Sequence, residues 1–322
     1  MSNAAEVAAV LRRKSSFILT SHARPDGDAV GSSVALALAL EAIGKKTRVL
    51  LRDPIPTPYL DFPELRRIEI TDRASGDADA VVLLECSELD RPDIAGLDQY
   101  YVVNVDHHLG NTMYGAVNWF DASYAACCEM VAEIIDALGV AWTPAIASHL
   151  YLGIATDTGG FRYGPIAERT FEICRRIAAT GVEPAKLSRQ IFDSYSIGRV
   201  RLMGALLNAM ELYHDDRLAV LSFDDALLKA SGATMDDTEG LVNMPLGARG
   251  VVAVALFKRQ GGDAWRVSLR SKGDVDVREV ATRWQGGGHR NAAGLTATGP
   301  IADVKKALVA ELKDAIDAVP AR

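Results

Sequence analysis

The stretch 17–28, Phe-Ile-Leu-Thr-Ser-His-Ala-Arg-Pro-Asp-Gly-Asp, joins an apolar run to a histidine and two carboxylates. The run at 17–21 is typical of a buried strand, and the aliphatic residues 29–43, ended by Gly44, are typical of a helix. In open α/β sheets, ligands bind outside the carboxyl ends of the strands. The stretch therefore predicts an α/β fold with a functional loop between its first strand and its first helix.

Three further apolar runs, at 47–52, 80–85 and 101–105, alternate with amphipathic helical stretches. This alternation predicts a largely parallel sheet with helices on both faces. After residue 214 the pattern changes to strands separated by turns, followed by an amphipathic helix at 302–318, which predicts a smaller second α/β domain. We expect a first domain over 1–190, a connecting helix or linker over 191–214 and a second domain over 215–322.

Carboxylates and imidazoles follow three of the predicted strands and one predicted helix. In chain order they are His22, Asp26, Asp28, Glu85, Asp106, His107, His108 and Asp157. Hard oxygen donors with imidazole suit Mn²⁺, Mg²⁺ or Zn²⁺, and the carboxylates exceed what one ion needs. Two adjacent divalent cations are therefore the economical interpretation.

Each of these motifs also has a purely structural interpretation. Asp28 could cap the following helix while Asp26 forms a turn, and Asp157 could be an ordinary surface residue. Asp106 could cap a turn with both histidines exposed. The metal interpretation is favoured at 106–108, because three ionisable groups at the end of a buried strand are costly unless something pairs with them.

A glycine run at 286–288 precedes His289. Backbone N–H groups of glycine-rich loops at helix starts bind anions, so the run predicts a phosphate or ribose contact. A flexible turn is the alternative.

Composition and net charge limit the kinds of molecule that the chain can bind. The 322 residues carry a formal charge of −7, which argues against coating long duplex nucleic acid. Residues 250–290 nevertheless hold eight Lys or Arg against four acids, which favours a small or short anionic substrate. The apolar run at 17–19 is too short for a signal peptide or membrane span, and the four cysteines lack metal-knuckle spacing. We expect a cytoplasmic protein with no membrane partner.

The ordered set of motifs resembles the DHH phosphoesterase superfamily, and the C-terminal half resembles its DHH-associated substrate-binding domain. The resemblance covers about residues 15–298 and is strongest to the branch of bacterial oligoribonucleases (nanoRNases) and 3′-phosphoadenosine 5′-phosphate (pAp) phosphatases. It implies a Mn²⁺-dependent phosphodiesterase that releases 5′-mononucleotides from short single-stranded RNA and also dephosphorylates pAp. It further implies an active site in the interdomain cleft and is compatible with a homodimer.

Carried over residue by residue, the resemblance implies one Mn²⁺ held by His22, Asp26 and Glu85. A second ion would be held by Asp28, Glu85, His107 and Asp157. His108 would contact the scissile phosphate and Asp106 would orient the adjacent imidazole. The residues implied to bind the phosphate or terminal nucleotide are Arg270, Ser271, Gly287, Gly288 and His289.

The chain departs from the family pattern at two positions. Glu85 stands where family members carry Asp, which adds a methylene of about 1.5 Å, and Asp90 is a second choice for this ligand. Gln285 replaces the first of four glycines. Two other functions stay open, namely a phosphodiesterase of c-di-AMP, pApA or pGpG, and a nucleotide-binding regulator whose site has decayed at Glu85. Substrate length, direction of attack and metal preference are also left open.

Overall fold

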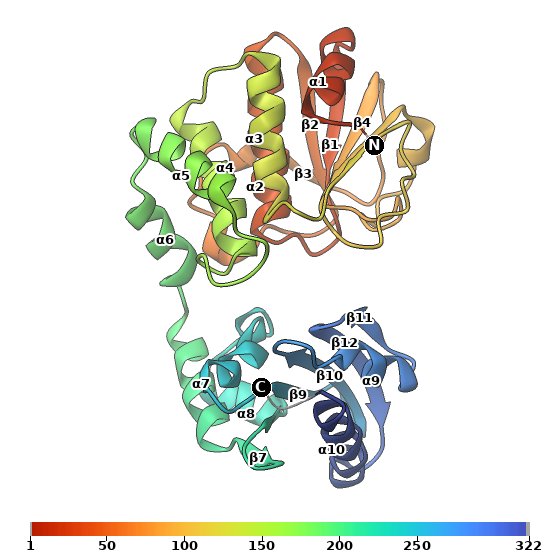
Figure 1. Ribbon diagram of the computed structural model, residues 1–322, viewed down its shortest axis with the longest axis vertical. Coiled ribbons are helices and arrows are strands. Elements are labelled where there is room, and N and C mark those ends of the chain that lie inside the picture. Colours follow the sequence, from red (N-terminus) through yellow and green to blue (C-terminus); the bar gives the residue numbers. More distant parts are fainter. Residues whose placement is uncertain (1, 320–322) are drawn as a thin grey trace. The chain divides into compact units, whose positions relative to one another are not determined.

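The computed structural model describes residues 2–319 and divides into two compact units, Met1–Ser194 and Tyr195–Arg322 (Figure 1). The domain limits of 1–190, 191–214 and 215–322 stay a prediction. Within residues 2–319, no helix combines the length and the apolar character that crossing a membrane requires.

The first unit is built on six parallel strands in the order β3-β2-β1-β4-β5-β6. Their bounds are Ser16–Thr20 (β1), Lys46–Leu51 (β2), Ile68–Ile70 (β3), Ala80–Leu84 (β4), Val102–Asp106 (β5) and Val117–Phe120 (β6). The chain adds strands outward from β1 to β3 and then returns to the other side of β1 for β4. The order therefore reverses between β1 and β4, and such a switch point opens a crevice at the carboxyl ends of the strands.

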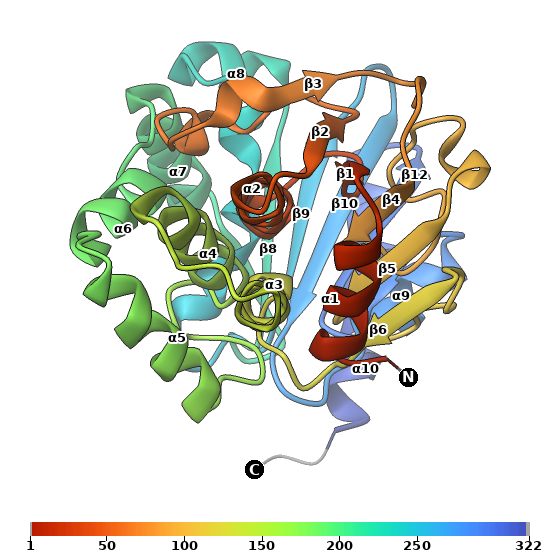
Figure 2. The same cartoon turned by 90° about the horizontal axis from the view of Figure 1, so that it is seen from above.

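One face of this sheet is covered by α-helices. The helices of the unit are Ala4–Arg13 (α1), Gly27–Ala42 (α2), Cys127–Leu138 (α3), Pro144–Asp157 (α4), Glu168–Ala179 (α5) and Pro184–Phe192 (α6). Phe17 and Leu19 of β1 and Val82 of β4 share a buried core with α1 to α4. Figure 2 shows α1, α2 and α3 along one side of the row of strands.

The sequence predicts α-helices on the opposite face of the sheet as well, but loops and a 3₁₀ helix cover that face. Ile18 and Val81 pack against Ile94 and Leu97, and Leu97 belongs to a short 3₁₀ helix, Leu97–Gln99. Pro92 and Gly96, with Asp93 at φ 53°, interrupt this connection, and such residues end helices. Loops and a 3₁₀ turn therefore pack against the second face of the sheet. The remaining 3₁₀ helices of this unit are Thr57–Tyr59 and Leu65–Arg67.

The second unit is a smaller α/β domain with a mixed sheet in the order β11-β12-β10-β9-β8-β7. Its strands are Glu211–Tyr213 (β7), Leu218–Phe223 (β8), Ala253–Arg259 (β9), Ala264–Ser271 (β10), Gly287–His289 (β11) and Ala292–Thr298 (β12). Helices Val277–Arg283 (α9) and Ile301–Asp317 (α10) cover one face. The other face is covered by Ile197–Asn208 (α7), Asp225–Ser231 (α8) and the 3₁₀ helices Asp236–Thr238 and Leu241–Gly247. The parallel α/β domain and the smaller second domain are thus both as the sequence predicts.

Candidate metal centre

Four predicted ligands from four separate segments meet at the carboxyl ends of β4 and β5. Asp28 lies in the first turn of α2, Glu85 follows β4, His107 follows β5, and Asp157 ends α4. One donor atom from each lies within 4.8 Å of the others. His107 Nε2 is 2.9 Å from Glu85 Oε1 and 3.3 Å from Asp157 Oδ2. This arrangement presents three carboxylates and one imidazole to a common point.

The chemistry of these donors fits a divalent cation. Glu85 Oε1 and His107 Nε2 are both buried, and within residues 2–319 neither has a hydrogen bond beyond its ion-pair contacts in the cluster, whereas buried polar atoms in proteins are normally bonded. Glu85, His107 and His108 form a second group with ligand spacing, because Glu85 Oε2 lies 3.0 Å from His108 Nδ1. Glu85 therefore belongs to both groups.

Asp28 is anchored by a helix that begins far along the chain. Its carboxylate accepts hydrogen bonds from the backbone N–H groups of Cys127 and Cys128 in the first turn of α3. Ala126, the residue before α3, has no side-chain acceptor for these groups. Asp28 supplies the missing acceptor. In the metal-free protein burial raises the pKa of Asp28 and the charges of Glu85 and Asp157 add to this shift, so a cation at the cluster would favour its ionised form.

His22 and Asp26 form a separate pair beside this cluster. Asp26 caps α2, because its Oδ1 accepts the N–H groups of Asp28 at 3.0 Å and Ala29 at 2.9 Å. The capping role that the sequence left open for Asp28 therefore belongs to Asp26. The other carboxylate oxygen of Asp26 lies 3.7 Å from His22 Nε2. His22 and Asp26 are outside the group of four whose donor atoms meet.

The electrostatics of the cluster follow from burial and crowding. Burial raises the pKa of Asp157 to about 7, and the negative charge of Glu85 adds to this shift. Burial opposes protonation of His107, but Glu85 and Asp157 outweigh it and raise its pKa to about 11. Burial also opposes protonation of His108, and its bonds to Asp106 and Glu85 raise its pKa to about 10. The crowded carboxylates thus attract positive charge strongly, and a bound cation would satisfy the same demand.

A second layer of side chains holds the histidines. Asp106 Oδ1 lies 2.9 Å from His108 Nδ1. Asp106 Oδ2 accepts a hydrogen bond from Nδ2 of Asn111 at 2.6 Å. His107 Nδ1 lies 2.9 Å from the carbonyl oxygen of Tyr124. Since a carbonyl only accepts, Nδ1 carries the proton and Nε2 points to the cluster. Asn111 and Tyr124 were not identified from the sequence as part of this site, because neither belongs to a recognisable motif.

Glu85 occupies its position through an unusual backbone. It is 2% exposed and has φ 62°, in the left-handed region. Glu85 therefore lies in a left-handed turn directly after β4. Asp90, the second choice for this ligand, is exposed and belongs to neither group of donors.

In the second unit, the predicted binding residues Arg270 and Ser271 differ in their surroundings. Arg270 on β10 is partly buried, and burial lowers its pKa. Ser271 points into the domain instead, where its hydroxyl donates to the carbonyl of Val275 at 2.7 Å. Lys258 and Arg266 are cross-strand partners on β9 and β10, and Arg266 shares the side of β10 that carries Arg270.

The glycine run forms the edge strand β11 and does not begin a helix. Gly287 and Gly288 pair with Gly294 and Ala293 of β12. A Cβ at Gly288 would overlap the carbonyl oxygen of Ala292, so this glycine permits close strand pairing. The predicted role of the His289 side chain lies outside the described part of the chain.

The chain is similar to known proteins along both units. Residues 16–154 match the DHH family, N-terminal domain, and residues 216–318 match the DHHA1 domain. A relative from Thermus thermophilus, named bifunctional oligoribonuclease and PAP phosphatase NrnA, is 34% identical over 285 residues, covering 87% of this chain and 84% of the relative.

Solved structures show the same fold. An exopolyphosphatase-related protein from Bacteroides fragilis has a TM-score of 0.88 and 25% identity, with 97% of this chain and 95% of that chain covered. Exonuclease RecJ bound to manganese has a TM-score of 0.62 and 15% identity, with 99% and 96% covered. The chain belongs to the DHH phosphoesterase family, and its second unit carries the DHHA1 domain.

Proposed function

We propose that this enzyme holds two divalent cations, in the first instance Mn²⁺, and hydrolyses short single-stranded oligoribonucleotides to 5′-mononucleotides, with pAp as a second substrate. The observation that carries the proposal is the convergence of Asp28, Glu85, His107 and Asp157 within 4.8 Å. The structural similarity to RecJ bound to manganese supports the choice of metal to test first.

The proposed ligand sets share Glu85. Asp28, Glu85, His107 and Asp157 would hold one ion, and His22, Asp26 and Glu85 would hold the other. Burial opposes a proton on His22, but Asp26 and, more weakly, the charge of Glu85 raise its pKa. Glu85 thus acts on both proposed ligand sets, which supports its bridging role. When bound, such a pair stabilises charge on phosphate oxygens and acidifies water.

The residues around the ligands would orient the substrate. His108 would contact the scissile phosphate, held by Asp106 at 2.9 Å. In the second unit, Arg270 would bind a phosphate or terminal nucleotide, together with backbone groups of Gly287 and Gly288 and with His289. Ser271 would support this region through its bond to Val275. Arg270 is partly buried and donates to the carbonyl of Leu269 at 2.9 Å, but it has no ion pair within residues 2–319. Its charge supports an anionic ligand.

The substrate class is supported by the printed names of the relatives and by the charge distribution. The Thermus thermophilus relative is named for oligoribonuclease and PAP phosphatase activity, and the basic residues of this acidic chain gather at 250–290. Together they favour short anionic substrates over long duplexes.

Hydrolysis of defined substrates tests the proposal. Purified protein with Mn²⁺ would be incubated with labelled di- to pentaribonucleotides and with pAp, and Asp157→Asn would serve as the control for contaminating nucleases. We expect AMP or other 5′-mononucleotides from the wild type and none from the control. Failure on both substrate types by protein that has bound Mn²⁺ contradicts the proposal. Tight nucleotide binding with fewer than two ions and no hydrolysis would identify the regulator instead.

A further inference from the structure

The segment that runs from the end of β6 into the first turn of α3, residues 121–128, contacts two of the proposed metal ligands. The carbonyl oxygen of Tyr124 bonds to Nδ1 of His107 at 2.9 Å. A few residues later, the N–H groups of Cys127 and Cys128 donate to Asp28. Any shift of this segment would therefore move two ligands that come from distant parts of the chain.

Arg169 holds this segment from the first turn of α5. Its Nη2 donates to the carbonyl of Ser123 at 2.8 Å, and its guanidinium carbon lies 3.6 Å from the centre of the Tyr124 ring. Its Nε lies 3.3 Å from Oε2 of Glu129. The same oxygen of Glu129 accepts the N–H of Ala125 at 3.1 Å. Arg169 thus contacts the backbone, the ring and the side-chain anchor of one short segment.

Two features show that this arrangement has a cost. A cation in the first turn of a helix is opposed by the helix dipole. Glu129 is fully buried, and its Oε1 finds no hydrogen-bond partner in the described part of the chain. In residues 2–319 the ion pair of Glu129 is with Arg169 alone. Arg169 is 29% exposed and Glu129 is fully buried. Replacing an ion pair of this kind by apolar residues of similar volume is often neutral for stability, whereas removing one partner leaves the other buried and unpaired.

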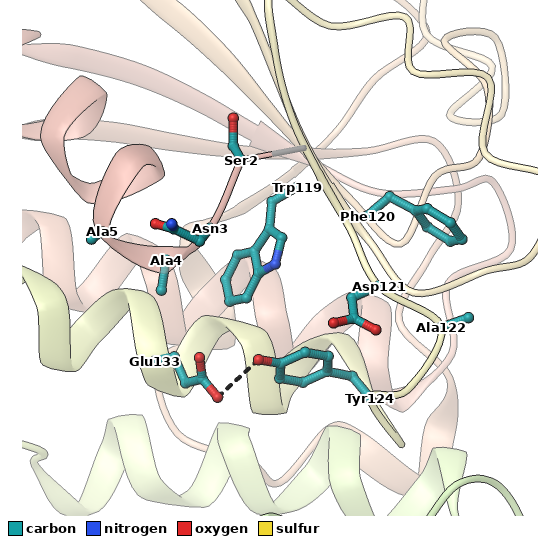
Figure 3. Close-up of a pocket in the computed structure, with 10 residues that line it drawn as sticks. All are labelled: Ser2, Asn3, Ala4, Ala5, Trp119, Phe120, Asp121, Ala122, Tyr124 and Glu133. Atoms are coloured by element: carbon teal, nitrogen blue, oxygen red, sulfur yellow. Dashed lines mark hydrogen bonds between the residues drawn. The ribbon is translucent and has the colours of Figure 1, made fainter.

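The ring of Tyr124 is held on its other sides as well. Its hydroxyl donates to Glu133 at 2.9 Å, and its ring meets Trp119 edge to face at 5.6 Å between centres. Figure 3 shows Trp119, Tyr124 and Glu133 lining a surface depression together with Asp121 and the first residues of the chain. The predicted ligands do not line this depression. The Tyr124 side chain therefore serves as an anchor for its own carbonyl group, which holds His107.

We propose that Arg169 is a positioning residue for the metal centre, acting through Ser123, Tyr124 and Glu129 on His107 and Asp28. The inference rests on the proposed metal centre and adds a residue that contacts neither ion nor substrate. Removing Arg169 would loosen the Tyr124 carbonyl and leave Glu129 buried and unpaired. Metal affinity should then fall more than the catalytic rate at saturating metal.

Calorimetric titration with Mn²⁺ tests the role of Arg169 directly. Mutation of groups that orient metal ligands typically weakens binding by about 10- to 100-fold, so we expect Arg169→Ala to bind Mn²⁺ about tenfold more weakly. Arg169→Lys keeps the charge and should recover part of the affinity. Arg175→Ala is the matched control, because Arg175 lies on the same helix and pairs with Glu172 on the surface.

A second measurement separates positioning from a general loss of structure. The rate of hydrolysis should approach the wild-type rate at high Mn²⁺, with the change confined to the Mn²⁺ concentration at half-maximal rate. Circular dichroism establishes which variants are folded. If Arg169→Ala does not fold, Arg169→Gln, which keeps an N–H donor and loses the charge, is measured by the same criteria.

The outcomes distinguish this inference from the proposed function. Folded Arg169 variants that bind Mn²⁺ as tightly as the wild type and as Arg175→Ala overturn the positioning role alone. A wild-type protein that binds no Mn²⁺ overturns the metal centre itself. Weaker Mn²⁺ binding confined to the Arg169 variants supports both.

Discussion

Asp28 lies directly against Gly153 of α4. A Cβ at residue 153 would overlap Asp28 Oδ1 and the Sγ atom of Cys128. Helices α2 and α4, which pack against each other, therefore meet through a glycine beside a proposed metal ligand. This contact ties packing of the helices to the geometry of the metal centre.

Gly153→Ala should lower the free energy of unfolding and weaken Mn²⁺ binding together. Overpacking of a tight core typically costs about 1–3 kcal/mol, and the displaced group here is Asp28. The control is Gly204→Ala on α7, where nothing lies within 4 Å of the added Cβ. That variant should gain about 0.5–1 kcal/mol, since Ala is favoured over Gly within a helix. Urea unfolding and Mn²⁺ titration of both variants check the prediction, and equal behaviour of the two would contradict it.

Asp157→Asn should abolish tight Mn²⁺ binding while leaving the metal-free protein at least as stable. Asp157 is repelled by Glu85 and disfavoured by burial, which together raise its pKa to about 7. An amide removes that repulsion in the metal-free protein and also removes a ligand from the bound state. Thermal unfolding in EDTA and in Mn²⁺ measures both effects. Stabilisation of this variant by Mn²⁺ to the wild-type extent would remove Asp157 from the ligand set.

Substitutions at Glu85 separate the need for charge from the need for length. Glu85→Gln should lose Mn²⁺ binding and hydrolysis, because the shared carboxylate of both donor groups is gone. Glu85→Asp keeps the charge, and Asp adopts the left-handed backbone at φ 62° more readily than Glu. Its shorter side chain should weaken Mn²⁺ binding without abolishing it. Measuring the number of Mn²⁺ ions bound per chain checks both predictions. Binding of two ions by Glu85→Gln with wild-type affinity would contradict the bridging role of Glu85.

Acid should destabilise the fold through His149, a residue of α4 that is fully buried. Burial lowers its pKa from 6.5 to about 4, while Nε2 lies 2.7 Å from the carbonyl of Pro63. The unfolded chain binds a proton at residue 149 between pH 6.5 and 4, and the folded chain does not. This contribution is therefore intact above pH 6.5 and is lost as the pH falls toward 4, with a total of about 3 kcal/mol.

Urea unfolding of the wild type and of His149→Gln at several pH values measures this effect. The variant keeps an N–H donor for Pro63 and has no group that titrates in this range. Its unfolding free energy should fall less steeply between pH 6.5 and 4. Identical slopes for the two proteins would show that His149 titrates normally in the fold.

The sequence predicts the part of the centre that depends on sheet geometry. Apolar runs mark β1, β4 and β5, and parallel strands bring the residues that follow them to one edge. Glu85 and His107 could therefore be placed together from their positions alone. Asp157 could be added because it ends a buried helix beside a glycine pair.

The remaining features depend on contacts that no local pattern encodes. Asp26 and Asp28 are nearly equivalent as sequence, and Asp28 is buried by contacts with the start of α3, about a hundred residues away in the chain, and with Gly153 of α4. The expected helices on the second face are replaced by a 3₁₀ turn and loops. Ser271 follows Arg270 directly, and strand alternation turns it into the core. Arg169 has no recognisable motif, because its role arises only when α5 packs beside residues 121–128.

Anomalous diffraction at the manganese absorption edge, from crystals grown with Mn²⁺, would locate the proposed ions. We expect two peaks that share Glu85, one beside Asp28, His107 and Asp157 and the other beside His22 and Asp26. Crystals that contain Mn²⁺ elsewhere but show no peak among these side chains would contradict the proposed metal centre.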